Sequence, residues 1–265
     1  MNRHWPWTRQ AAPDRLGAGA LGRDSPAPGC WGYREILLLL VVGALAQPLA
    51  SLAAVLIAEL LGVTEIEEAQ ALLQRDARVA VAAQIVAWIP PMAYVVLIVS
   101  VRYRLPLREG LTWTKPAGST RSYIRTGVLL GFASLLVSIA MGDAGQQSPM
   151  RELFADREHL WILAAFGVLA APVLEEVVFR GFLFAAFERA HGPWAALVVT
   201  SALFALLHGA QYGWQWQRLV VLAAIGSALG AVRMQSGSAK ASTIVHAAYN
   251  GLLFLAVISF FSGVG

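Results

Sequence analysis

The chain has 265 residues, of which 57% are hydrophobic and only 14% are charged. Soluble domains carry about 25% charged residues, so the composition excludes an ordinary soluble protein and indicates an integral membrane protein in contact with the lipid bilayer. The net charge of +4 does not indicate nucleic-acid binding, because the basic residues lie between apolar runs, as positive-inside sorting of membrane proteins produces.

The apolar runs predict an all-α fold, a polytopic bundle of about seven transmembrane helices in one membrane domain. A helix of about 20 apolar residues crosses the ~30 Å hydrocarbon core of a bilayer. The expected spans are residues 36–61, 79–101, 126–141, 160–189, 194–208, 219–232 and 241–261. The fifth and sixth are short enough to be tilted or partly re-entrant.

The connections between these spans predict the orientation of the chain in the membrane. Residues 1–34 hold several prolines and arginines without apolar periodicity, and we expect a disordered cytoplasmic tail there. The most basic connection, 102–125, and the short basic turn 233–240 are assigned to the cytoplasm by the positive-inside rule. The N-terminus is therefore expected inside and the C-terminus outside, in a plasma membrane.

Three charged residues interrupt the fourth apolar run. Glu175, Glu176 and Arg180 lie within six residues of one another, although each charge at bilayer depth costs about 2.5–3.5 kcal/mol. Residues four apart share a helix face, so Glu176 and Arg180 are expected to form an ion pair, while Glu175 points about 100° away and stays available. Taken alone, the ion pair could equally brace the bundle.

Two later spans also carry polar groups in pairs of residues four positions apart. Phe204 precedes His208 near the end of the fifth span, and His246 precedes Asn250 in the seventh. Singly, His208 suits a helix-end interface and Asn250 an interhelical hydrogen bond. Polar groups on one stripe of three separate spans together indicate a functional site.

The depth of these residues in the bilayer provides a check. At 1.5 Å per residue from the cytoplasmic interface, Glu175 and His208 both lie about 22 Å deep, and Asn250 lies about 16 Å deep. By the same count His246 lies only about 10 Å deep. It reaches the other residues only if the last span is tilted or has an unwound start.

Two kinds of hydrolytic chemistry fit this set of side chains. A carboxylate beside an imidazole can hold and deprotonate a water, and a histidine with an asparagine can hydrogen-bond the oxyanion that forms when water attacks a carbonyl, without any cofactor. Alternatively, Glu175, His208 and His246 could hold zinc, because two histidines and one carboxylate form a known zinc set. No Gly-x-Ser-x-Gly or His-Glu-x-x-His motif occurs.

The three pairs resemble the motifs of the CAAX protease and bacteriocin-processing family, also called the Abi family. Glu175-Glu176 to Arg180 is similar to its first motif, Glu-Glu-x-x-x-Arg; Phe204 to His208 is similar to Phe-x-x-x-His; and His246 to Asn250 is similar to His-x-x-x-Asn. The similarity covers about residues 160–261. On this basis the chain divides into N-terminal transmembrane helices, 35–159, and a catalytic membrane core, 160–265.

The resemblance implies an intramembrane endopeptidase that acts on a membrane-associated peptide or a lipid-anchored protein. Carried over from the family, the roles are as follows: Glu175 and His208 activate water, His246 and Asn250 hold the oxyanion, and Glu176 and Arg180 support the site. Eukaryotic members trim prenylated proteins, whereas bacterial members are tied to bacteriocin maturation, immunity or peptide signalling. The short chain, rich in Ala and Arg, looks bacterial, so a prenylated substrate is not expected.

Two functions of other classes remain open. A non-catalytic membrane scaffold in peptide signalling or bacteriocin immunity would not need the intact motif set that the chain carries. A proton-coupled carrier could use Glu175 and His208 as a relay, but the sequence shows no repeat with paired broken helices, which such carriers commonly have.

Overall fold

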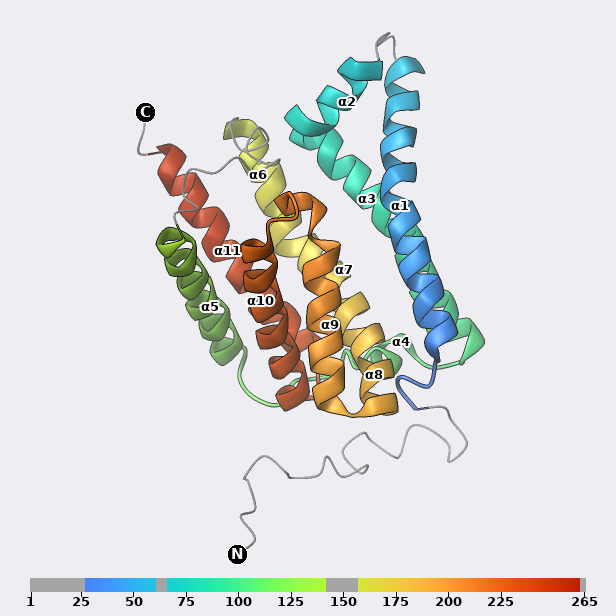
Figure 1. Ribbon diagram of the computed structural model, residues 1–265. Coiled ribbons are helices and arrows are strands. Elements are labelled where there is room, and N and C mark those ends of the chain that lie inside the picture. The colour runs from blue at the N-terminus through green and yellow to red at the C-terminus, as the bar shows by residue number, and fades with distance from the viewer. Residues whose placement is uncertain (1–26, 61–65, 142–156, 263–265) are drawn as a thin grey trace, which may run out of the picture.

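The computed structural model describes residues 27–60, 66–141 and 157–262, and all regular structure within these ranges is helical (Figure 1). This confirms the all-α prediction. The described residues form six helical stretches that are long and apolar enough to cross a membrane: Tyr33–Leu56, Ala77–Arg102, Thr120–Ala140, His159–His191, Trp216–Ser236 and Ala239–Ser259. A further apolar helix, Pro193–Leu207, is shorter, so the number of spans is close to the expected seven.

The first part of the bundle is a helical hairpin. Helix α1 (Tyr33–Leu60) packs against α3 (Ala77–Val96), and the short α2 (Ile66–Arg75) precedes α3 at the top of Figure 1. Asp76 caps α3 by accepting a hydrogen bond from the Arg78 backbone N–H at 2.8 Å. The hydrogen bond from the Arg78 side chain lowers the pKa of the Asp76 carboxyl to about 2, so this cap keeps its charge at neutral pH.

The fourth span is one long helix with two changes of winding. It consists of α6 (Arg157–Ala165), a π-helical stretch Phe166–Ala170, α7 (Ala171–Glu176), a second π-helical stretch Val177–Leu183, and α8 (Phe184–His191). Pro172 follows the first π-helical stretch, and its missing backbone N–H accounts for the interrupted hydrogen-bond ladder there. π-Helical turns occur often at functional sites, and α7 carries both adjacent glutamates.

The remaining helices surround this span. Gly192 (φ 83°) ends α8 in a conformation that glycine adopts at little cost, and Pro193 opens α9 (Pro193–Leu207). A 3₁₀ turn (Ala210–Tyr212) leads to α10 (Trp216–Ser236), which is longer at both ends than the expected span 219–232, and α11 (Ala239–Ser262) follows.

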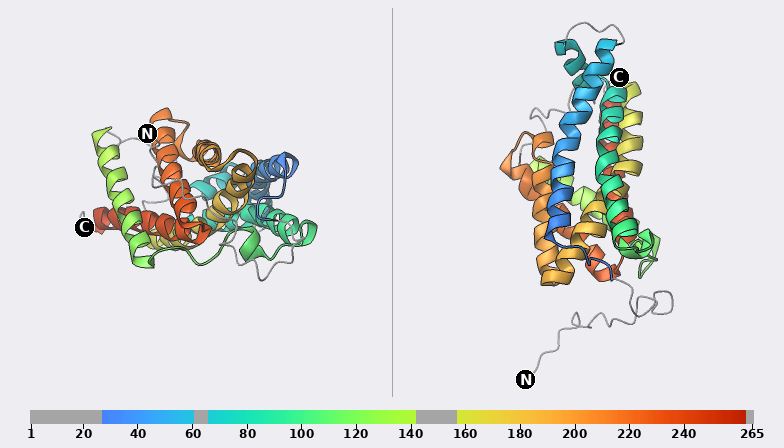
Figure 2. Two further views of the ribbon diagram at one scale, coloured as in Figure 1. Left: turned by 90° about the horizontal axis from the view of Figure 1, so that it is seen from below. Right: turned by 90° about the vertical axis from the view of Figure 1, so that its right-hand side faces the viewer.

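Helix α5 (Thr120–Ala140) lies along α11, at the opposite end of the bundle from α1 (Figures 1 and 2). The two backbones approach closely at Gly127, where an added Cβ would lie 2.3 Å from the Val245 carbonyl oxygen. Short α4 (Leu107–Gly110) belongs to the connection between α3 and α5. Many large apolar side chains on α1, α3 and α5 are exposed, as expected for helices that face lipid.

The described end of the predicted tail is not disordered. Trp31 is buried, stacks on Phe182 with ring centroids 4.5 Å apart, and donates its indole N–H to the Phe182 carbonyl at 3.1 Å. An aromatic residue near the end of the expected tail, 1–34, therefore joins this segment to the fourth span. Residues 1–26 lie outside the described residues, as do residues 142–156 of the connection between the third and fourth spans.

Candidate active site

The expected ion pair between Glu176 and Arg180 is present and fully buried. Arg180 Nη1 donates to Glu176 Oε1 at 2.8 Å, and Arg180 Nη2 donates to the Gly226 carbonyl of α10 at 2.7 Å. His246 Nδ1 lies 3.0 Å from the same Glu176 oxygen. Glu176 thus connects the fourth span to α11, and Arg180 connects it to α10.

Glu175 points away from that pair and faces two imidazole rings. Its Oε2 lies 3.8 Å from Nε2 of His208 and 3.8 Å from Nε2 of His246. This oxygen is buried and has no hydrogen-bond partner among the described residues. The structure therefore brings together one carboxylate and the two histidines that the sequence placed on separate spans.

Hydrogen bonds on the far side of each ring set the protonation of the two histidines. His208 Nδ1 lies 2.7 Å from the Phe204 carbonyl oxygen, which can only accept, so Nδ1 carries a proton. His246 Nδ1 faces the Glu176 carboxylate in the same manner. In neutral rings, both Nε2 atoms therefore present lone pairs toward Glu175.

Phe204 also explains the spacing of the second motif. Besides accepting from His208 one helical turn later, it places its ring 4.4 Å from the His208 ring and 5.9 Å from the His246 ring, between centroids. The Arg180 guanidinium carbon lies 5.1 Å from the centroid of the same phenyl ring, within cation–π range. Phe204 thus forms an apolar wall shared by three polar residues.

His246 reaches Glu175 although the count along the sequence placed it closer to the membrane surface. Ser238 and Ala239 are completely buried, the Ala239 N–H donates to the Thr112 carbonyl at 3.0 Å, and Ser238 Oγ donates to the Thr114 carbonyl at 2.7 Å. The start of α11 is covered by the connection after α4.

Asn250 lies one turn beyond His246 on α11. Its Nδ2 donates to the Gly167 carbonyl at 2.6 Å, within the first π-helical stretch. A primary amide has two hydrogens on its nitrogen, so this bond holds the side chain against the fourth span and leaves one hydrogen for another acceptor.

Arg233 is a buried residue that the sequence reading missed. It was assigned to a cytoplasmic turn, but it is only 4% exposed. Its Nε donates to the Arg180 carbonyl at 3.3 Å, and its Nη2 lies 3.5 Å from Glu188. Its spacing in the sequence could have predicted this burial. Arg233 follows Gly226 by two helical turns, so both residues lie on one face of α10.

The zinc alternative requires Glu175, His208 and His246 to approach a single ion. Among the described residues, no group of three or more His, Cys, Asp or Glu side chains is arranged to hold a metal ion. Adjacent ligand atoms around tetrahedral zinc lie roughly 3.4 Å apart at usual bond lengths, and Glu175 Oε2 lies 3.8 Å from either Nε2, so the absence of a metal stays a prediction.

Part of the chain matches a known protein family. Residues 157–252 match the family described as type II CAAX prenyl endopeptidase Rce1-like. The match begins with α6 and ends just beyond Asn250, so it includes all three motifs. No curated protein and no solved structure matches the chain. The match confirms the resemblance that the motifs indicated.

Proposed function

We propose that the chain, whose residues 157–252 match the family of Rce1-like CAAX endopeptidases, hydrolyses a peptide bond of a membrane-associated substrate with a water activated by Glu175 and His208. The observation that carries this proposal is the convergence of two imidazole Nε2 atoms on Glu175 Oε2, each 3.8 Å from it, in a largely buried site.

The distance between Glu175 and His208 suits a bridging water. Both facing atoms accept hydrogen bonds, and a water oxygen about 2.8 Å from each can donate one hydrogen to either side. Its lone pairs then point away from both residues, toward the carbonyl carbon of a bound peptide. As the oxygen attacks, Glu175 takes one proton. The same proton passes to the amide nitrogen when the carbon–nitrogen bond breaks.

His246 and Asn250 are the proposed donors to the oxyanion. A doubly protonated His246 would present Nε2–H to the oxyanion while its Nδ1–H stays bonded to Glu176, 3.0 Å away. Asn250 would contribute the amide hydrogen that Gly167 does not occupy. Because both donors are already held by hydrogen bonds to Glu176 and to the Gly167 carbonyl, little reorganisation is needed as charge develops. Glu176 and Arg180 orient His246 and touch no reacting atom.

The test is cleavage of a reporter that carries a scissile segment next to a membrane anchor, with purified protein in liposomes. Glu175→Gln is expected to abolish cleavage, because an amide cannot take the proton from water. Glu67→Gln is the matched control, since Glu67 is exposed on α2. Cleavage by Glu175→Gln at the wild-type rate would exclude Glu175 as the base, and absence of cleavage by the wild type on any substrate would favour a scaffold or a carrier.

A further inference from the structure

Two arginines join the fourth span and α10 in opposite directions. Arg180, in the second π-helical stretch, donates its Nη2 to the Gly226 carbonyl of α10 at 2.7 Å. Arg233, two turns further along α10, donates its Nε to the Arg180 carbonyl at 3.3 Å. Each helix thus supplies one side chain to the backbone of the other, and Arg180 takes part in both bonds.

The carbonyl that Arg233 reaches is one that the fourth span itself does not use. In the second π-helical stretch, the Phe184 N–H donates to the Phe179 carbonyl, five residues earlier, and so passes over the Arg180 carbonyl. The winding becomes α-helical again in α8, where each N–H is directed four residues back, so the next N–H is directed to Gly181. A buried carbonyl needs a donor, and Arg233 supplies it.

The Arg233 side chain is held between this carbonyl and α8. Its Nη2 lies 3.5 Å from Glu188 Oε2, and its guanidinium carbon lies 5.3 Å from the centroid of the Phe184 ring, within cation–π range. A planar guanidinium serves a carbonyl through Nε and a carboxylate through Nη2 at the same time. The single ammonium of a lysine has no separate group for each partner.

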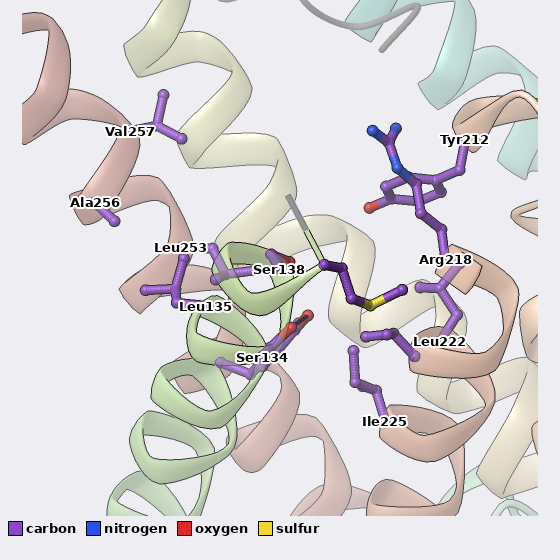
Figure 3. Close-up of a pocket in the computed structure, with 13 residues that line it drawn as sticks. Ser134, Leu135, Ser138, Tyr212, Arg218, Leu222, Ile225, Leu253, Ala256 and Val257 are labelled. Atoms are coloured by element: carbon purple, nitrogen blue, oxygen red, sulfur yellow. Dashed lines mark hydrogen bonds between the residues drawn. The ribbon is translucent and has the colours of Figure 1, made fainter. Parts of the chain in front are cut away.

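Packing contributes less to the position of α10 on the side that faces α5. Leu222 and Ile225, which precede Gly226, line a cavity of about 460 Å³ between α5, α10 and α11 (Figure 3). Side chains that border a cavity lack part of their van der Waals contacts. The bonds of Arg180 and Arg233 on the side of the fourth span are therefore important for holding Gly226 in place.

Arg180 connects this arrangement to the reacting groups. Its Nη1 donates to Glu176 Oε1 at 2.8 Å, and His246 Nδ1 lies 3.0 Å from the same oxygen. His246 Nε2 lies 3.8 Å from Glu175 Oε2. A shift of the Arg180 backbone would therefore move the donor that holds Glu176, and with it the carboxylate that orients His246.

We propose that Arg233 is a positioning residue for the reaction. It supplies the donor that the Arg180 carbonyl lacks, and so keeps the second π-helical stretch wound in the way that lets Arg180 meet Glu176 and Gly226 together. The inference rests on the proposed function, because it assigns Arg233 a part in the same reaction. Arg233 touches no reacting atom. Its loss should lower kcat and leave KM nearly unchanged, because the oxyanion donor His246 is held less firmly while substrate binding is not affected.

Nuclear magnetic resonance of protein labelled at its arginine nitrogens tests the geometry without any substrate. The Nε–H signal of Arg180 is identified as the one that disappears in Arg180→Met. It should shift in Arg233→Gln, because the guanidinium moves relative to the Phe204 ring, whose centroid is 5.1 Å from its carbon. It should keep its position in Glu188→Gln and in the control Arg125→Gln, an exposed residue on α5. An unshifted Arg180 signal in Arg233→Gln would overturn the inference.

Cleavage of the reporter separates the bond to the carbonyl from the ion pair with Glu188. Arg233→Gln should lower kcat about 10–100-fold, the range of one hydrogen bond to a charged group. Glu188→Gln should stay within about 3-fold of the wild type, as ordinary surface changes do, because Nε still reaches the carbonyl. Arg233→Lys keeps the charge but not the Nε–H, so it should be less active than Glu188→Gln.

Two kinetic results would contradict a positioning role. If Glu188→Gln is as damaging as Arg233→Gln, the ion pair is responsible and the bond to the carbonyl is not. If Arg233→Gln keeps the wild-type kcat, or changes KM alone, Arg233 does not act on the reacting groups. Where Arg233→Gln does not accumulate as a folded protein, Arg233→Lys replaces it in both measurements. If the wild type cleaves nothing, the proposed function fails, whereas the resonance comparison still decides whether Arg233 positions Arg180.

Discussion

Replacing Arg180 with methionine tests whether the buried charges hold the site together. Arg180 is completely buried and donates to Glu176 and to the Gly226 carbonyl. Methionine fills much of the space but leaves the Glu176 carboxylate with His246 as its remaining partner. Breaking a buried pair costs about 3–5 kcal/mol. At roughly 2–4 °C per kcal/mol for a chain of this size, the melting temperature should fall by about 6–20 °C.

The double variant Glu176→Gln/Arg180→Met shows how much of that loss comes from the unpaired charge. Removing both charges eliminates the buried carboxylate, while the Gly226 carbonyl still lacks its donor, at a cost of about 1–3 kcal/mol. The double variant should therefore recover about 2 kcal/mol relative to Arg180→Met. Arg125→Met, an exposed arginine on α5, is the control and should change stability by less than about 0.5 kcal/mol.

Thermal unfolding of the purified proteins in one detergent, followed by tryptophan fluorescence, measures these differences. If Arg180→Met melts within 2 °C of Arg125→Met (roughly 1 kcal/mol or less), the pair does not stabilise the fold. If the double variant is as unstable as the single one, the loss arises from packing and the bond to Gly226, and the buried charge is not its cause.

Three further predictions concern the base, the oxyanion donors and the orientation. Glu175→Gln should melt within about 2 °C of the wild type, since the facing oxygen of Glu175 has no hydrogen-bond partner in the described structure; a large drop would make Glu175 a structural residue. His246→Ala and Asn250→Ala should each lower kcat by about 10²–10³, and the purified enzyme should hold no stoichiometric zinc and survive chelation. One zinc per chain, lost and restored together with activity, would instead establish a metalloprotease. A cysteine in place of Lys115 should react with a membrane-impermeant reagent only from the cytoplasm, and a cysteine in place of Glu67 only from outside. The reverse pattern would contradict the proposed orientation.

Local periodicity correctly predicted the contacts within each helix of the candidate site. Glu176 and Arg180 pair because residues four apart share a helix face, and Glu175 remains free of that pair for the same reason. Phe204 reaches His208 by the same spacing. Composition alone indicated that the helices contact the lipid bilayer, because a chain with so few charged residues cannot cover a water-facing surface.

Relations between helices could not be obtained in this way. His246 meets Glu175, and Asn250 reaches Gly167, because α11 packs against α7 and the first π-helical stretch of the fourth span. Arg233 is buried because α10 extends past its expected end, and Trp31 is buried because the segment before α1 returns to Phe182. Each of these contacts joins segments that are far apart in the chain. Its geometry depends on where a helix starts and on which neighbouring helix it packs against. The local sequence determines neither of these.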